Sequence, residues 1–81
     1  MAGSKLPHAD DYRRLGHALR LLRRRAGMTQ REAASTVGIR SEFVSEVERG
    51  NRGLRWHMLV ALVNAYRSSL AELAKEIERG D

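Results

Sequence analysis

The sequence predicts an all-α domain of five helices. Apolar residues recur at helical spacings of three and four, glycines follow several apolar segments, and two four-residue segments have the pattern of a capping box. Together these features mark where helices begin and end, and no strand is predicted. The helices are expected at about 11–26, 30–37, 41–49, 56–66 and 70–79, in a domain covering residues 10–79 that follows a flexible N-terminal arm, residues 1–9.

The first predicted helix has an apolar stripe with spacings of four, three and four residues. Asp10 and Asp11 stand ahead of the stripe, and arginines fall in the last turn, where cations suit the helix dipole. Gly27 can adopt the left-handed conformation that stops a helix. The stripe consists of Leu15, Leu19, Leu22 and Ala26, and the arginines are Arg23, Arg24 and Arg25.

A sharp corner follows between the second and third helices. Thr29 and Glu32 have the spacing of a capping box, which opens a helix of about two turns. Gly38 ends it at once, and Ile39 is apolar where a tight turn would hold one side chain beneath two helices. The sequence therefore predicts a helix-turn-helix corner. The third helix carries Phe43, Val44 and Val47 at helical spacing and ends before Gly50.

The fourth helix follows a loop, residues 51–53, and its broad apolar face suits a buried helix. Helical spacing places Trp56 and Tyr66 in the core, with contact between one of them and a dimer partner as the alternative. The whole face comprises Trp56, Leu59, Val60, Leu62, Val63 and Tyr66.

The fifth helix opens with a second capping box, formed by Ser69 and Glu72. Its apolar residues, Leu70, Leu73 and Ile77, are expected to face inward.

Size and composition restrict the possible functions. A chain of 81 residues forms one small domain, in which a deep active-site cleft is not expected. The absence of cysteine excludes disulfides and thiolate metal sites. No apolar stretch reaches the roughly 18 residues of a membrane span, and the first residues lack a signal peptide's apolar run. We expect a soluble cytoplasmic, nucleoid-associated protein with no metal, cofactor or small-molecule ligand.

The charge distribution favours a polyanionic partner. The net charge is +5, with arginines crowded into the first half of the chain and carboxylates into the last segment. A solvated helix face is the alternative for individual arginines such as Arg13, Arg14 and Arg20.

Residues 29–50 resemble the helix-turn-helix domains of the Cro and lambda-repressor-like family, also called XRE-type. The matching residues are Thr29-Gln30, Ala34, Val37-Gly38-Ile39, Val44-Ser45 and Val47-Glu48-Arg49-Gly50. Weaker similarity extends upstream to Leu15-Gly16 and downstream to Leu73. The resemblance implies a compact five-helix lambda-repressor-like domain whose third helix enters the major groove of DNA.

The resemblance also implies roles for individual residues. The start and outer face of the third helix would read bases, the first turn of the second helix and the end of the third would contact phosphates, and one ion pair would be structural. The base-reading residues would be Arg40, Ser41, Glu42, Ser45 and Glu46, the phosphate-contacting residues Gln30, Arg31, Arg49, Asn51 and Arg52, and the ion pair Arg23 and Glu48.

The chain departs from the family pattern at several positions. Glu42 and Glu46 place carboxylates where neutral or basic residues are usual, so a base donor or an arginine must offset each of them. Arg40 stands where an N-cap Ser or Thr is common, and Ser41 could cap the third helix instead. Ala33 replaces a core leucine, Leu54 a proline, and Arg67 a helix-ending glycine.

These features predict a transcriptional regulator that binds double-stranded DNA in a sequence-specific manner. We expect a repressor that acts as a homodimer on a near-palindromic operator. Helix five, with Leu70, Leu73 and Ile77, is the candidate interface, and dimers that form only on DNA are the alternative. An enzyme is not expected, because the three histidines lie far apart and no paired-carboxylate site occurs. The alternative function is a helix-turn-helix protein-interaction module, such as an adaptor or an antitoxin-like partner.

Overall fold

The computed structural model describes residues 9–79 of the chain. This range contains five α-helices joined by turns and loops. The all-α prediction is confirmed, and no strand occurs in this range. Compared with the predicted bounds, α1 begins two residues earlier, and α1, α3 and α4 each end one residue earlier. The predicted arm, residues 1–9, lies outside the described residues except for Ala9, which opens α1. The helices are α1 (Ala9–Arg25), α2 (Gln30–Val37), α3 (Ser41–Glu48), α4 (Trp56–Ala65) and α5 (Leu70–Arg79).

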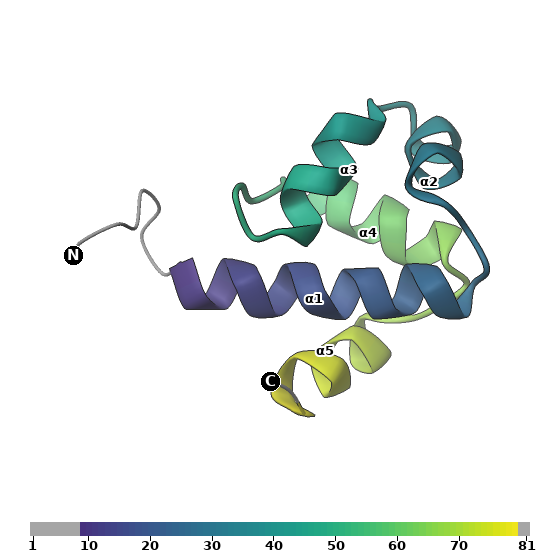
Figure 1. The fold of residues 1–81 in the computed structure, drawn as a ribbon. Helices are drawn as coiled ribbons and strands as arrows, with labels where there is room; N and C mark the ends of the chain where they lie inside the picture. The colour runs from purple at the N-terminus through teal and green to yellow at the C-terminus, as the bar shows by residue number, and fades with distance from the viewer. Residues whose placement is uncertain (1–8, 80–81) are drawn as a thin grey trace.

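The long helix α1 divides the molecule. α2, α3 and α4 lie on one side of it, and α5 lies on the other (Figure 1). α1 packs against α3 and α5, while α2 packs against α3 and α4. Every helix contributes at least one buried apolar residue to a single core. The buried residues of this core are Ala18, Leu19, Leu22, Ala33, Val47, Leu62, Val63, Tyr66 and Leu73.

The corner between α2 and α3 is defined at both ends of α2. Thr29 Oγ1 accepts from the Glu32 N–H at 3.0 Å, and Glu32 Oε1 accepts from the Thr29 N–H at 2.9 Å, so the predicted capping box is present. At the other end Gly38 has φ +79, a left-handed conformation that glycine adopts without steric cost. The Ile39 N–H then bonds to the Ala34 carbonyl at 2.9 Å, which closes the turn.

Close contact between two backbones fixes α3 on α1. Gly16 is buried at their crossing, where a Cβ atom would lie 2.2 Å from the Val47 carbonyl oxygen and 2.8 Å from that of Glu48. Only glycine allows the helices to approach this closely. The orientation of α3 is therefore set by the backbone of α1.

Two apolar residues predicted to face inward do not. Trp56 is 66% exposed and Leu70 is 39% exposed. Each is the first residue of its helix, and the buried residues come later: Leu62 and Val63 in α4, and Leu73 in α5. Helical spacing identified the apolar side correctly, but neighbouring helices cover only its later turns.

The structure corrects the capping suggested for α3 and confirms one of the two hydrogen bonds of the capping box predicted at α5. Ser41 does not cap α3: Arg40 is the N-cap residue, without a side-chain hydrogen bond, and Ser41 is the first helical residue. At α5, Ser69 Oγ accepts from the Glu72 N–H at 3.1 Å, while the Glu72 carboxylate lies 3.8 Å from Lys75 Nζ.

Polar contacts that sequence reasoning did not anticipate hold α5 on α1. Arg25 Nη1 donates to Glu76 Oε2 at 2.8 Å, and Arg14 Nη2 donates to the Ile77 carbonyl at 3.0 Å. Glu76 is buried, as is Leu73, and Ile77 packs partly buried against the core. The inward face of α5 is therefore already engaged within the chain.

None of the described helices combines the length and the apolar character needed to cross a membrane.

Candidate nucleic-acid interface

The outer face of α3 carries the residues predicted to read bases. α3 buries Val44, Val47 and Glu48 against the rest of the molecule. Helical periodicity places Glu42, Ser45 and Glu46 away from this buried side, while Phe43 packs partly buried against the core and Arg40 immediately precedes the helix. Arg40 and Glu42 are exposed, and Ser41, Ser45 and Glu46 are partly exposed. The structure thus brings the five predicted residues together on one surface.

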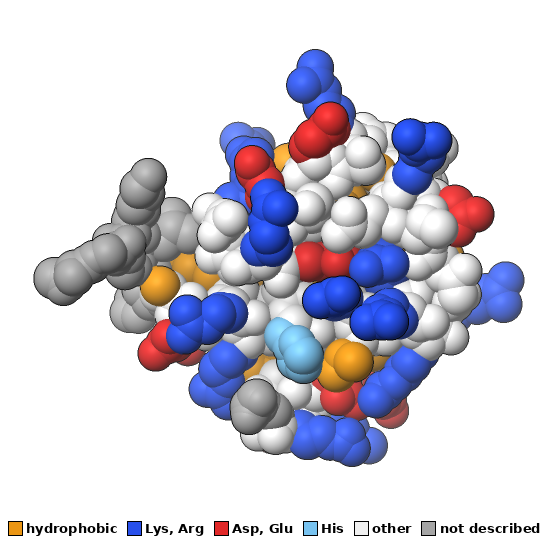
Figure 2. Space-filling model, in the orientation of Figure 1, with side chains coloured by type: hydrophobic (Ala, Val, Ile, Leu, Met, Phe, Trp, Pro, Cys, Tyr) orange, Lys and Arg blue, Asp and Glu red, His pale blue; other side chains and the backbone are white. Residues whose placement is uncertain are grey.

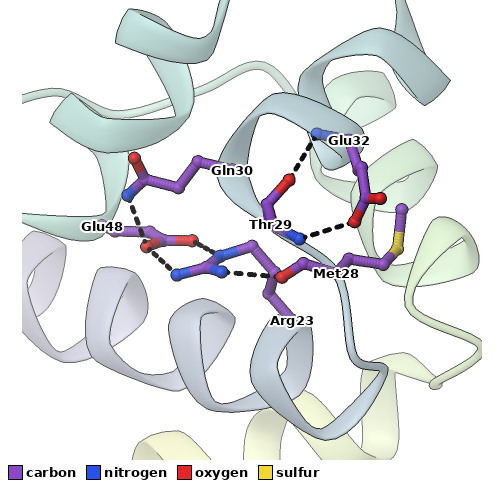
Figure 3. Close-up of polar contacts among 6 residues, drawn as sticks. All are labelled: Arg23, Met28, Thr29, Gln30, Glu32 and Glu48. Atoms are coloured by element: carbon purple, nitrogen blue, oxygen red, sulfur yellow. Dashed lines mark hydrogen bonds and ion pairs between the residues drawn. The ribbon is translucent and has the colours of Figure 1, made fainter.

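A buried polar network supports this surface from inside (Figure 3). Arg23 Nε donates to Glu48 Oε2 at 2.7 Å, and Arg23 Nη2 donates to Glu48 Oε1 at 3.0 Å. Arg23 Nη1 donates to the Met28 carbonyl at 2.8 Å. This is the ion pair that the family resemblance implies. It joins the end of α1, the segment before α2 and the end of α3.

Gln30 belongs to the same network. Its Nε2 donates to Glu48 Oε1 at 3.0 Å, so the side chain lies along the inner side of α2 and contacts a carboxylate (Figure 3). Sequence reasoning assigned this side chain to a phosphate of DNA. The Nε2 group has a second N–H, and the backbone N–H of Gln30 lies in the first turn of α2, so the side chain and the backbone both keep a donor for that contact.

Electrostatics keep Arg23 charged and the nearby Tyr66 neutral. The hydrogen bond with Glu48 raises the pKa of Arg23 above its ordinary value, so Arg23 stays charged. Burial raises the pKa of Tyr66 to about 12, with Glu48 adding to the shift and Arg23 opposing it. Tyr66 is therefore neutral at physiological pH, and among the described residues its hydroxyl is a buried polar group without a hydrogen-bond partner.

A shallow groove lies at the start of α2 and reaches the first residue of α3. The open end of a helix favours anions, because its first N–H groups have no acceptor within the helix. Sequence reasoning placed Arg24 in the arginine-rich first half of the chain but gave it no phosphate contact of its own, although its closeness in sequence to the Thr29 cap was a usable signal. The groove is lined by Arg23, Arg24, Gly27, Met28, Thr29, Gln30, Arg31 and Ser41.

The far end of α3 carries the other predicted phosphate-contacting residues. Arg49 is the C-cap residue and is exposed, as is Asn51. Arg52 is engaged within the chain: its Nη1 lies 3.2 Å from Glu46 Oε1, and its Cζ lies 4.4 Å from the centre of the Phe43 ring. Sequence reasoning missed the role of Phe43, because the contact depends on the path of the loop after α3.

Basic side chains are spread widely over the molecular face drawn in Figure 2, and acidic side chains lie among them over the region of α3. The predicted interface is therefore mixed in charge. His17 and His57 are exposed, while His8 lies outside the described residues. Across residues 9–79, no group of three or more metal-ligating His, Asp or Glu side chains occurs.

Comparison with known proteins agrees with this architecture. The family model described as a helix-turn-helix domain matches residues 14–75. The chain is 31% identical to the clp gene regulator ClgR from Corynebacterium glutamicum, over 84% of this chain and 72% of that one, with a TM-score of 0.81. It is also 31% identical to the restriction-modification controller protein C.AhdI from Aeromonas hydrophila, over 79% of this chain and 97% of that one, with a TM-score of 0.74.

A third similar structure is a mutant of the restriction-modification controller protein C.Esp1396I. It is 25% identical, over 88% of this chain and 95% of that one, with a TM-score of 0.75. A search of proteins with curated functions found no match. Because the family model covers most of the chain and the folds agree, the chain belongs to the Cro and lambda-repressor-like (XRE-type) family of helix-turn-helix domains.

Proposed function

We propose that this chain is a transcriptional regulator that binds double-stranded DNA in a sequence-specific manner and represses as a homodimer on a near-palindromic operator. The observation that carries the proposal is α3, which is anchored by Val44, Val47 and Glu48 and turns its other face to solvent. A helix with its side chains is about 10–12 Å wide and fits a major groove about 12 Å wide.

The exposed side chains of α3 have the chemistry for reading bases. Arg40 can donate two hydrogen bonds to the O6 and N7 atoms of guanine. Glu42 or Glu46 can accept from the amino group of cytosine, and Ser41 and Ser45 can bond to a base or a phosphate. Arg40 is the strongest candidate, because it is exposed and stands at the end of the helix that enters the groove first in this family.

Phosphate contacts would hold the domain in register. The start of α2 offers the N–H groups of Gln30 and Arg31 together with the side chains of Arg24 and Arg31. Arg49 and Asn51 offer donors at the other end of α3. Each phosphate neutralised would release counterions and steepen the salt dependence of binding.

The dimer would place two copies of α3 about 34 Å apart, in successive major grooves. The predicted α5 interface retains only Leu70 as an exposed large apolar residue, because Leu73 is buried and Ile77 packs on the core. We therefore favour dimers that assemble on DNA. Trp56, at 66% exposure, is a candidate contact for the second copy.

The similar structures support a regulatory role. ClgR is described as a regulator of clp genes, and C.AhdI as a controller of a restriction-modification system. A repressor that acts by occupying its operator needs only a bound dimer that blocks polymerase. A domain whose described part contains one small core is sufficient for that role.

The test is selection of duplexes from a random DNA pool by the purified chain, with affinity then followed from low to physiological salt. We expect a near-palindromic motif whose half-sites are about one helical turn apart. Arg40→Gln should reduce preference at one position of each half-site by about tenfold. Arg79→Gln removes the same charge from α5, on the other side of α1, and should recover the wild-type motif. Binding that shows no preference among DNA sequences and is lost at physiological salt would contradict the proposal.

A further inference from the structure

The loop after α3 is held firmly against α1. A Cβ atom on Gly50 would lie 2.7 Å from Arg13 Cα, and one on Gly53 would lie 2.4 Å from Tyr12 Cε1. Gly50 also has φ +78, and the next N–H, that of Asn51, donates to the Glu46 carbonyl at 2.9 Å. Both ends of the loop are therefore fixed, and its path returns Arg52 to the side of α3.

Arg52 makes two contacts with α3. Its Nη1 donates to Glu46 Oε1 at 3.2 Å, and its guanidinium carbon lies 4.4 Å from the centre of the Phe43 ring. Phe43 packs partly buried against the core, so it provides a fixed platform for the flat guanidinium group. Glu46 and Arg52 are 43% and 48% exposed, so the pair lies at the surface and is accessible to DNA.

We propose that Arg52 determines base preference by positioning Glu46, instead of contacting a phosphate. The inference rests on the proposed function, because it assigns a role within the same DNA-binding surface. A carboxylate entering a groove lined with phosphates needs a nearby cation, and Arg52 supplies it from the same chain. Glu46 Oε1 accepts from Arg52, and this bond leaves Oε2 available to accept from a cytosine amino group.

Geometry favours positioning over phosphate contact. An arginine that reached for a phosphate would have to leave both the Phe43 ring and the Glu46 carboxylate. Its departure would leave Glu46 uncompensated next to the DNA backbone. Arg49 differs in this respect, because it is exposed at the C-cap of α3 and no carboxylate among the described residues pairs with it. It is therefore the control arginine, the one expected to contact a phosphate.

The experiment compares Glu46→Gln, Arg52→Gln, Arg52→Lys and the Glu46→Gln/Arg52→Gln double variant with wild type, by selection from a random pool and by affinity at several salt concentrations. We expect the two single Gln variants to lose about tenfold of discrimination at the same base pair. The double variant should lose no more than either single variant. Arg52→Lys should also lose discrimination, because an ammonium group cannot lie flat on Phe43 while it bonds to Glu46.

The slope of log affinity against log salt provides the second readout. It should be unchanged in Arg52→Gln and smaller by about one in the control Arg49→Gln, which should weaken binding to all sequences about equally. Thermal unfolding checks that every variant is folded. An Arg52→Gln variant that keeps full base preference but behaves like Arg49→Gln in salt would overturn the inference. A wild-type chain that selects no motif at all would overturn the proposed function instead, and this inference with it.

Discussion

Replacing Glu48 by Gln tests the buried network that supports α3. The substitution keeps the shape of the side chain and removes its charge. Arg23, only 8% exposed, would lose both charge-assisted hydrogen bonds in their present form, at 2.7 and 3.0 Å. The acceptor for Gln30 Nε2, at 3.0 Å, would also be weakened. The variant therefore leaves a guanidinium group buried without its counter-charge.

The expected cost is large for a domain of this size. Removing one partner of a buried ion pair costs about 3–5 kcal/mol. Total stability is about 0.05–0.15 kcal/mol per residue, which for 81 residues corresponds to about 4–12 kcal/mol. Each kcal/mol shifts Tm by about 4–8 °C in a domain of this length, so a loss of about 3 kcal/mol lowers Tm by about 12 °C or more.

Thermal and urea unfolding followed by circular dichroism measure this loss. The matched control replaces both partners, Arg23→Met together with Glu48→Leu, and should recover most of the stability, because no unpaired charge remains. If the free energy of unfolding of Glu48→Gln lies within about 1 kcal/mol of the wild-type value, the network does not stabilise the fold in this way.

Three further predictions concern packing, backbone conformation and pH. Gly16→Ala should lower the free energy of unfolding by at least about 3 kcal/mol in urea titrations, because its Cβ would lie 2.2 Å from the Val47 carbonyl oxygen; near-wild-type stability would contradict the described helix crossing. Arg67 has φ +57, so Arg67→Gly should raise Tm by relieving about 1 kcal/mol of backbone strain, and a lower Tm would count against that strain. The hydrogen bond with Arg25 lowers the pKa of Glu76, so its contribution to stability is complete above the ordinary value of about 4.3 and is lost as pH falls through the lower folded value. Tm values of wild type and Glu76→Gln should therefore differ at pH 6 and converge in acid, and a difference independent of pH would exclude this linkage.

Local features of the fold could be predicted because the signals are local. The Thr29 capping box and the breaks at Gly27 and Gly38 depend on residues within a few positions of each other. Helical spacing likewise identified most buried residues. It failed at Trp56 and Leu70, because spacing reports which side of a helix is apolar and not which turns another helix covers.

Contacts between distant segments were harder to predict. The Arg25–Glu76 ion pair joins α1 to α5, and nothing in either segment identifies the other as its partner. The Arg23–Glu48 pair also joins segments far apart in the sequence, but the resemblance to a known family implied it.

The candidate site shows the same difference between features set by local sequence and features set by contacts between distant segments. The period of a single helix accounts for the exposure of Glu42, Ser45 and Glu46, and Arg40 directly precedes that helix. The inward turn of Gln30 and the stacking of Arg52 on Phe43 do not follow from it, since they depend on the buried Glu48 and on the path of the loop after α3. The sequence therefore predicted which surface to consider, and the structure shows which side chains on it are already engaged.

The most direct test of the central claim, that the outer face of α3 binds DNA, is titration of the isotope-labelled chain with its selected duplex, followed by backbone amide chemical shifts. We predict that the largest changes fall on Gln30 and Arg31 at the start of α2 and on residues 41–46 of α3, with small changes along α5. Large changes confined to α5 and Trp56, with α3 unaffected, would contradict this claim and favour a protein-interaction module.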